Sequence, residues 1–211
     1  MARNTERRAA LVDAAVAVLA REGARGLTFR AVDAEAAVPV GTASNYFSDR
    51  DDLLNQVDTH LHRRLAPDPA VLAGLLAAPR DRALVLEFMR DLLGRATRDR
   101  TGYLALFEMR LEATRRPTLR ASYTASVRGD LEQAMEFHRD AGLPGGDRTV
   151  AVLYLAVLGL LLEHLTLPGV LADALPGVAV PDGLLETIVT TIVPDDDDGG
   201  DGDQEGAGNR A

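Results

Sequence analysis

Hydrophobic residues recur at helical spacing along nearly the whole chain. The first stripe follows the i, i+3, i+4, i+7, i+8 pattern of one buried helical face. It consists of Leu11, Ala14, Ala15, Val18 and Leu19. Gly23 and Gly26 predict the end of this helix, because glycine is common where a helix closes in a left-handed turn.

Three short helical segments are expected next. Thr28 is the predicted N-cap of a helix over residues 29–36. Residues 39–47 form a third short helix, because proline favours the first helical turn. Ser48 or Asp49 is predicted to cap a fourth helix that begins directly afterwards, with acidic residues in its first turn, where the helix dipole favours anions.

The rest of the chain predicts longer helices. Their apolar stripes are Val85, Phe88, Met89, Leu92 and Leu93; Leu104, Phe107 and Leu111, with Glu108 among them; Leu119 to His138; and Leu185, Ile188, Val189 and Ile192. Residues 150–162 are apolar on all sides, so a helix there must be covered by other helices on both of its sides. This run falls short of the roughly 20 residues that cross a bilayer. Strand alternation is not evident, so we expect an all-α fold.

Composition restricts the chemistry of the chain. Cysteine is absent, which excludes disulfides, thiolate zinc sites and a cysteine nucleophile. All 23 basic residues are arginine, and the net charge is −9. Residues 1–50 hold seven arginines against six acids, whereas residues 194–211 hold one against seven. The acidity therefore spares the N-terminal end, which permits binding to nucleic acid there.

Low complexity marks the C-terminal end. The acidic tail, residues 194–211, has no apolar anchor, and we expect it to be disordered. Its GGDGD fragment is similar to calcium-binding repeats, but such repeats form a site only when several copies stack. Disorder is the preferred interpretation over a calcium site.

Two short helices joined by a tight turn, over residues 29–36 and 40–47, are typical of a helix-turn-helix, whose second helix enters a DNA major groove. The stretch REGARGLTFRAVDAEAAVPVGTASNYFSDRDDLL resembles the N-terminal signature of TetR/AcrR-type transcriptional regulators, closely over residues 7–54. The resemblance implies an N-terminal three-helix helix-turn-helix domain over residues 1–49. A larger helical ligand-binding and dimerisation bundle would follow over residues 50–193.

The resemblance also implies DNA contacts from eight residues. They are Thr28, Arg30, Val40, Thr42, Ser44, Asn45, Tyr46 and Arg50. Thr28, Arg30 and Arg50 would lie near phosphates, since helix N-termini and arginines bind them. Ala43 and Phe47, on the opposite face, would anchor the third helix. Tyr46 could instead be a core aromatic, and Arg7 and Arg8 are interpreted first as solvated.

Residues 37–45 depart from the family pattern at several positions. Ala37, Pro39 and Val40 stand where the family often has Gly, Ser and a basic residue, and Ser44 and Asn45 stand where it usually has aromatics. Fewer phosphate and stacking contacts follow, so the operator sequence of relatives does not transfer to this chain.

The second domain is expected to pair two copies and bind an effector. Residues 147–165 and 182–193 would form a four-helix interface in a homodimer; the alternative is that both helices complete a monomeric core. The candidate effector contacts are Phe88, Met89, Leu92, Phe107, Glu108, Tyr123, Val127 and His138. Mostly apolar surroundings with a few polar groups are typical of small-molecule sites. Simple packing for the phenylalanines and a structural hydrogen bond for His138 remain the plain alternatives.

An enzyme is the less favoured class. The chain has no glycine-rich phosphate loop, no nucleophile elbow and no histidine–carboxylate metal spacing, and it implies no cofactor and no catalytic residue. His60 and His62 diverge on a helix, and Asp49, Asp51 and Asp52 are interpreted as helix caps rather than as a metal site. The expected function is a cytoplasmic, ligand-responsive repressor that binds a palindromic double-stranded DNA operator, without a membrane partner. The alternative is a helical small-molecule-binding module with a degenerate helix-turn-helix.

Asn45 is the sharpest candidate for base reading, because an amide can pair bidentately with adenine. We expect Asn45→Ala to relax the preference at one or two base positions, measured by profiling bound sequences. An unchanged base preference in the variant would contradict the assignment of Asn45 to base reading.

Overall fold

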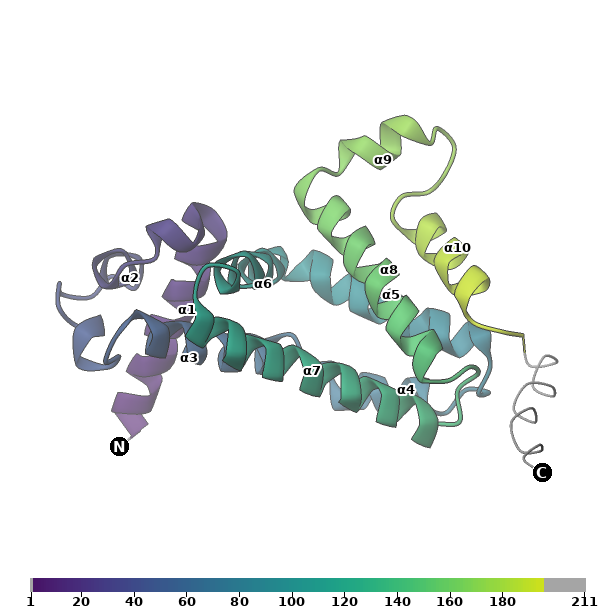
Figure 1. Ribbon diagram of the computed structural model, residues 1–211, viewed down its shortest axis with the longest axis horizontal. Coiled ribbons are helices and arrows are strands. Elements are labelled where there is room, and N and C mark those ends of the chain that lie inside the picture. The colour runs from purple at the N-terminus through teal and green to yellow at the C-terminus, as the bar shows by residue number, and fades with distance from the viewer. Residues whose placement is uncertain (1, 196–211) are drawn as a thin grey trace, which may run out of the picture. The chain divides into compact units, whose positions relative to one another are not determined.

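The computed structural model describes residues 2–195, and these residues form helices without a strand. The order is α1 (Ala2–Gly26), α2 (Phe29–Glu35), η1 (Ala43–Asn45), α3 (Arg50–Arg64), α4 (Pro69–Leu75), α5 (Arg82–Arg98), α6 (Arg100–Ala113), α7 (Pro117–Asp140), α8 (Asp147–Thr166), α9 (Gly169–Ala174) and α10 (Asp182–Ile192) (Figure 1). The all-α prediction is confirmed. The predicted tail lies outside the described residues, except for its first two.

Three helix ends near the N-terminus are set by residues that the sequence indicated. Gly23 leaves the helical region with φ 69°, which kinks α1 before it ends at Gly26. The Thr28 hydroxyl accepts the Ala31 N–H at 3.1 Å and caps α2. Asp49 accepts the Asp52 N–H at 2.8 Å and caps α3. The short helices α4 and α9 were not expected; they lie in proline- and glycine-punctuated connections.

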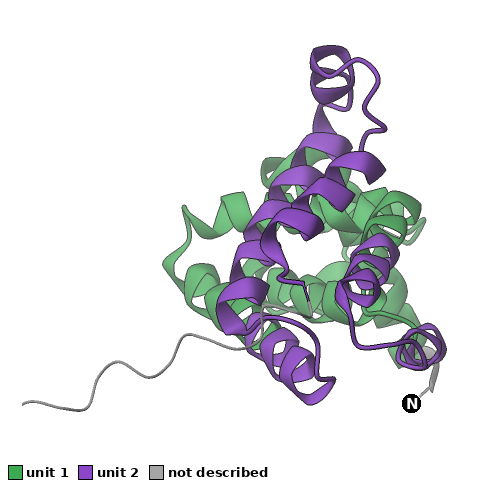
Figure 2. Ribbon diagram, turned by 90° about the vertical axis from the view of Figure 1, so that its right-hand side faces the viewer, with its two compact units in different colours: residues 1–68, 92–130 green, residues 69–91, 131–211 purple. Residues whose placement is uncertain are grey.

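The chain divides into two compact units (Figure 2). Unit 1 comprises Met1–Asp68 and Leu92–Asp130, and unit 2 comprises Pro69–Asp91 and Leu131–Ala211. Helices α5 and α7 each contribute residues to both units. The domain boundary expected after residue 49 stays a prediction.

The core of unit 1 forms where α1 packs against α2, α3 and α6. The apolar stripe predicted on α1 is buried throughout. The stripe predicted on α6 is wrong, since Leu111 is exposed and Leu104 and Phe107 are only half-buried. Three of the buried residues of α6 are small, Gly102, Ala105 and Ala113, and the others are Tyr103, Met109 and Glu112. Small side chains allow helices to approach closely, which a stripe of leucines would prevent.

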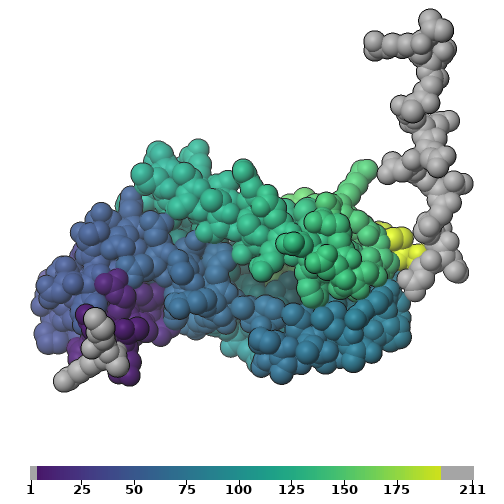
Figure 3. Space-filling model, turned by 90° about the horizontal axis from the view of Figure 1, so that it is seen from below, coloured from purple at the N-terminus to yellow at the C-terminus, as the bar shows by residue number. Residues whose placement is uncertain are grey.

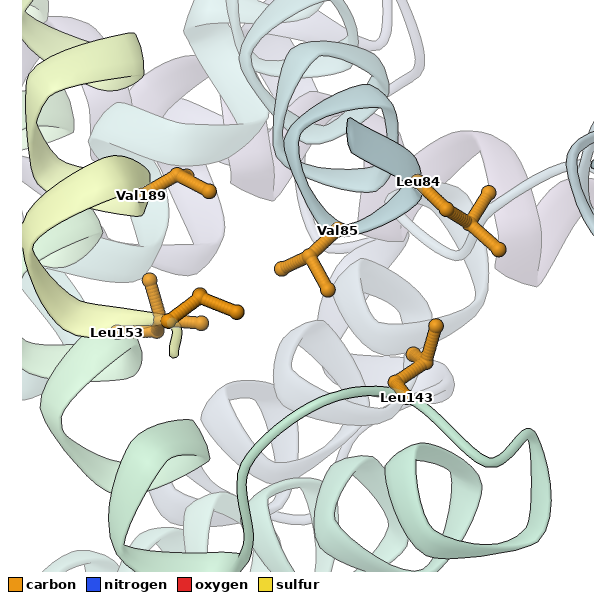
Figure 4. Packing of buried hydrophobic residues seen from close by; sticks show 6 residues of the cluster. Leu84, Val85, Leu143, Leu153 and Val189 are labelled. Carbon is orange, nitrogen blue, oxygen red and sulfur yellow. The ribbon is translucent and has the colours of Figure 1, made fainter. Parts of the chain in front are cut away.

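The core of unit 2 is an apolar cluster drawn from α5, α8, α10 and the α7–α8 connection (Figure 4). Its buried members are Leu84, Val85, Leu143, Leu153, Val189 and Val193. Helix α10 packs beside α8 (Figure 1). The Arg82 side chain donates from Nε to the Val193 carbonyl at 2.8 Å, which ties the start of α5 to the end of α10.

Helix α8 combines a buried face with an exposed apolar one. Leu153, Val157 and Leu161 are buried, whereas Leu155 and Leu162 are exposed. By length and composition alone, α8 could cross a membrane, since the whole 20-residue helix is longer than its apolar run. Core helices of soluble proteins pass the same test, and one face of α8 already belongs to the core of unit 2.

A row of polar pairs joins α3 to the first half of α7 within unit 1. The Thr118 hydroxyl donates to Asp51 at 2.9 Å, Ser122 to Asn55 at 2.9 Å, and Ser126 to Asp58 at 2.7 Å; His62 Nε2 lies 2.7 Å from Asp130 Oδ2. Residue numbers rise together on the two helices, so these stretches run parallel. We refer to these four pairs as the polar ladder.

Two ladder groups have raised pKa values. Burial is the main cause that raises the pKa of Asp58. For His62, burial acts to lower the pKa, but it is outweighed by the Asp58 carbonyl and by the carboxylates of Asp58 and Asp130, so the net pKa is raised. A group whose pKa is higher in the folded than in the unfolded state stabilises the fold at low pH, and this stabilisation is lost as pH rises through the folded pKa.

His62→Gln should therefore cost more stability at low than at high pH. We expect the difference in unfolding free energy between the parent and the variant to shrink between about pH 5.5 and about pH 8.5, since an unperturbed histidine titrates near 6.5. Urea unfolding at several pH values measures it. Asp130→Asn should flatten the same dependence by removing a partner of His62; a difference independent of pH would contradict a charged His62.

Candidate nucleic-acid interface

The third segment of the helix-turn-helix is anchored by two buried residues. Ala43 and Phe47 are fully buried, as expected for the inward face of this segment. The Phe47 ring lies 6.4 Å from that of Phe29 on α2. The Arg8 guanidinium lies 5.7 Å from the Phe47 ring and 5.8 Å from the Tyr46 ring, within the range of a cation–π contact. This core fixes residues 42–46 against α1 and α2.

The recognition helix predicted over residues 40–47 is shorter than expected. Only Ala43–Asn45 forms a helix, of the 3₁₀ type. Gly41 has φ 92°, a left-handed conformation that a right-handed helix starting at Pro39 cannot contain. Proline and valine therefore lie in the turn before the helix, and we call Gly41–Phe47 the reading segment.

Polar side chains of the reading segment bond back to its own backbone. The Thr42 hydroxyl donates to the Pro39 carbonyl at 2.5 Å. Both Ser44 Oγ and Asn45 Nδ2 donate to the Gly41 carbonyl, at 2.8 Å and 3.0 Å. An amide nitrogen carries two hydrogens, so Asn45 keeps one donor and its acceptor oxygen for a base edge.

Three other predicted contacts lie at or near the surface around this segment. Val40 is 79% exposed, in the turn before η1. Arg30 is exposed on α2, and Tyr46 is half-buried beneath Arg8. The purple surface of α1 is bordered in the space-filling view by the blue surface of the segments that follow it (Figure 3). The sequence therefore places apolar, aromatic and basic groups together around the reading segment.

Sequence reasoning missed Asp33, which shapes the reading segment from α2. Its carboxylate is 1% exposed. Oδ2 accepts the Gly41 N–H at 2.7 Å and Oδ1 accepts the Ala43 N–H at 2.7 Å. An acidic residue within the apolar run of a short helix was the available signal, because a buried carboxylate needs hydrogen-bond donors.

Arg50, a predicted phosphate contact, turns inward in unit 1. Its Nη2 donates to the Ala24 carbonyl and lies 3.5 Å from Glu112 Oε1. Its Nε is buried without a hydrogen-bond partner among the described residues. These contacts engage the guanidinium at the junction of α1, α3 and α6, and its role toward phosphate stays a prediction.

Glu112 is the centre of this junction. Its side chain is nearly buried, and it accepts a hydrogen bond from Arg116 Nε at 2.7 Å, with Arg115 at 3.6 Å. Arg116 reaches on to Asp51 at 2.8 Å, at the start of α3. The bond to Glu112 is the main cause that raises the pKa of Arg116. We refer to Arg50, Asp51, Glu112 and Arg116 as the arginine–carboxylate junction.

The eight predicted effector contacts divide between the units. Leu92, Phe107, Glu108, Tyr123 and Val127 belong to unit 1, and Phe88, Met89 and His138 belong to unit 2. Several have partners of their own. Glu108 accepts the Ala24 N–H at 3.3 Å, the Tyr123 hydroxyl donates to the Leu106 carbonyl at 3.2 Å, and His138 Nε2 lies 3.0 Å from the Pro144 carbonyl.

The predicted effector contacts Phe88 and Met89 pack at the edge of the core of unit 2. Phe88 and Phe137 meet edge to face with ring centroids 5.5 Å apart, and Met89 packs against the same apolar cluster. No group of three or more potential metal ligands occurs within residues 2–195. His60 pairs with Asp13 and His62 with Asp130, so the two histidines serve separate contacts.

Comparisons with known proteins agree with this architecture. Residues 11–57 match the family model for bacterial regulatory proteins of the tetR family, and residues 80–195 match the tetracyclin repressor-like C-terminal domain. Among curated proteins, none matches the chain.

Solved structures cover nearly the whole chain. The multidrug binding protein EbrR complexed with imidazole is 27% identical, covers 89% of this chain and 95% of its own, and has a TM-score of 0.62. A TetR family member from Streptomyces coelicolor A3 is 26% identical, with 90% and 99% covered and a TM-score of 0.65. EbrR complexed with malachite green is 26% identical, with 90% and 99% covered and a TM-score of 0.60.

Regulators with these two domains bind DNA and small molecules and are not enzymes. The matches to both domain models, together with the helix-turn-helix geometry, identify the chain as a transcriptional regulator of the TetR family.

Proposed function

We propose that the protein is a cytoplasmic repressor that binds a palindromic operator as a homodimer and leaves it when a small, largely apolar effector binds. The observation that carries this proposal is the reading segment, which a buried anchor holds with its Ser44 and Asn45 exposed and with Val40 exposed directly before it. Thr28, Arg30 and Tyr46 lie on the same helix-turn-helix and would add phosphate contacts. Base contacts would then come from Val40, Thr42, Ser44 and Asn45.

The exposed face of α8 supports pairing of two copies. Val152, Leu155 and Leu162 are exposed at helical spacing, and Leu155 is 65% exposed. Gly159 lies on the same helix, and a side chain added there would meet no atom within 4 Å. A bare backbone position within an apolar stripe lets a second helix approach closely. Residues 147–165 are thus suited to form one half of the proposed interface.

Helix α10 would supply the other half, residues 182–193. Thr187, Thr190 and Thr191 are exposed, and each hydroxyl donates to a carbonyl one turn earlier on the same helix. With the hydroxyl hydrogens satisfied internally, the methyl groups remain to meet a partner. This face can therefore be covered without leaving polar groups unpaired.

The likeness to EbrR supports the nature of the effector. EbrR structures hold ethidium, proflavin and malachite green, which are aromatic dyes. The apolar residues that the sequence marked as effector contacts are half-buried and of the type that packs on aromatic ligands: Phe88 and Met89 in unit 2, and Leu92, Phe107 and Val127 in unit 1. The internal hydrogen bonds of Tyr123 and His138 favour structural roles for these two. Glu108 instead contacts the end of α1.

The arginine–carboxylate junction offers a route from effector to DNA. Helix α6 carries Phe107 directly before Glu108 and five residues before Glu112, and these two acids contact Ala24 and Arg50. A shift of α6 on effector binding would therefore move the ends of the elements that frame the reading segment. Allosteric release requires such a differential contact between two states.

Selection of bound sequences from a random duplex pool tests the operator proposal. We expect the parent protein to enrich a palindrome, because a two-fold dimer presents two reading segments to two half-sites. A pool without enrichment at low salt would instead favour a ligand-binding module with a degenerate helix-turn-helix.

Leu155→Arg, in the same experiment, tests the contribution of the dimer apart from that of the reading segment. This exposed position tolerates arginine within one copy, but a charge at the centre of the proposed interface would be desolvated. We expect a monomer by light scattering and loss of the palindrome. Val71→Arg, at an exposed apolar position on α4, should leave both unchanged.

Ethidium and malachite green are the first probes of the effector site. We expect a bound probe to weaken operator binding of the parent by about 10-fold or more, within the usual range of allosteric coupling. Glu112→Gln should bind the probe equally but show a release factor below about 3-fold, because the α6 contact to Arg50 loses its charge.

Glu87→Gln is the matched control, since Glu87 pairs with Arg90 within unit 2, whereas the junction residues belong to unit 1. Fluorescence anisotropy of labelled operator, with and without probe, measures each release factor. An unchanged factor in Glu112→Gln would remove the junction from the route while leaving the operator proposal intact.

A further inference from the structure

The helix-turn-helix contains a buried carboxylate without a basic partner. Asp33 is 1% exposed, and no arginine or histidine within residues 2–195 forms an ion pair with it. Both of its oxygens are nevertheless occupied, by the N–H groups of Gly41 and Ala43 at 2.7 Å each. Hydrogen bonds to an ionised acceptor are the strong kind, and two of them account for a carboxylate at this depth.

The N–H groups of the reading segment have two kinds of acceptor: local backbone carbonyls serve Thr42, Asn45, Tyr46 and Phe47, and Asp33 serves Gly41 and Ala43. The helical part of the segment has three residues, and the first N–H groups of a helix have no partner within that helix. Asp33 supplies acceptors for two N–H groups that flank Thr42. It therefore adds two acceptors to the backbone hydrogen bonds that the segment forms locally.

Both the N–H and the carbonyl of Gly41 form hydrogen bonds with side chains. Its N–H donates to Asp33, and its carbonyl accepts from Ser44 and Asn45. Its left-handed φ of 92° turns the chain so that both contacts form at one residue. A continuous path of hydrogen bonds thus runs from a buried group on α2 to two exposed side chains of the reading segment.

We propose that Asp33 is a positioning residue for sequence reading: through Gly41 and Ala43 it orders the reading segment before DNA binds. This inference rests on the proposed operator binding. Ordering a segment in advance lowers the entropy that specific binding must otherwise overcome. Phosphate contacts from arginines elsewhere carry no sequence information and do not need the ordered segment. Asp33 therefore acts on discrimination between operator and random DNA.

Asp33→Asn tests this role with nearly unchanged volume. The amide keeps one acceptor, but its NH₂ group faces a backbone N–H, so one of the two bonds is lost. We expect operator affinity to fall about 10- to 100-fold, in line with the loss of a charged hydrogen bond, while affinity for random DNA changes less than about 2-fold. Amide hydrogen exchange at Gly41 and Ala43 should accelerate.

Asp99→Asn is the matched control. Asp99 Oδ1 accepts the Gly102 N–H at 3.0 Å at the start of α6, and Arg64 donates to both Asp99 oxygens, so this variant also loses a carboxylate that caps backbone, together with an ion pair that Asp33 does not have. We expect a comparable loss of unfolding free energy but an unchanged ratio of operator to random affinity. An equal fall of the ratio in both variants would assign the effect of Asp33 to stability alone and overturn the proposal.

If Asp33→Asn does not fold, amide hydrogen exchange of the parent protein still tests whether the reading segment is ordered before DNA binds. The Gly41 and Ala43 amides should exchange as slowly as those within α2; exchange at the rate of an open loop would overturn the proposal. The parent's own selection separates the two hypotheses. A parent that enriches no sequence contradicts the operator proposal, whereas Asp33→Asn with unchanged discrimination contradicts only the role of Asp33.

Discussion

The near-complete burial of the Glu112 carboxylate is the constraint on which unit 1 depends. A buried charge is tolerated only when it is paired and hydrogen-bonded, and Glu112 meets this requirement with arginines from two directions. Arg116 comes from the turn after its own helix, and Arg50 comes from the first residue of α3. Because Arg50 also bonds to the end of α1, satisfying one carboxylate fixes where three helices meet. The helix-turn-helix is therefore seated by electrostatics as well as by its small apolar core.

Features that depend on neighbouring residues were predictable from the sequence. Residue type and local position in the chain indicated three kinds of feature: the caps Thr28 and Asp49, the break at Gly23, and the buried anchors Ala43 and Phe47. The buried face of α6 was not predictable in this way. Its apolar residues surround the helix, so tertiary packing against α1 selected the small ones and left Leu111 exposed.

The reading segment illustrates the same limit at the candidate site. Its residue types indicated a DNA contact, but the left-handed turn at Gly41 and the acceptor role of Asp33 depend on a contact eight to ten residues away. Arg50 similarly resembles a phosphate contact in the linear pattern, although Glu112, 62 residues later, engages it. Long-range charge pairs leave no periodic signal, so spacing alone cannot assign them.

The break at Gly23 affects whether the first 49 residues of this chain can be exchanged for those of another regulator. Breaking the helix leaves the Ala24 N–H in need of an acceptor, and Glu108 of α6 provides it. A side chain at residue 23 would approach Glu108 Oε2 to 3.1 Å, so the glycine and the acid fit as a pair. A chimera joined after residue 49 would separate that pair and would also part Arg50 from the α1 carbonyl it binds. In this chain the first 49 residues are therefore matched to α6 through Gly23 and Glu108, and a replacement for them would need a residue that fits Glu108 at position 23.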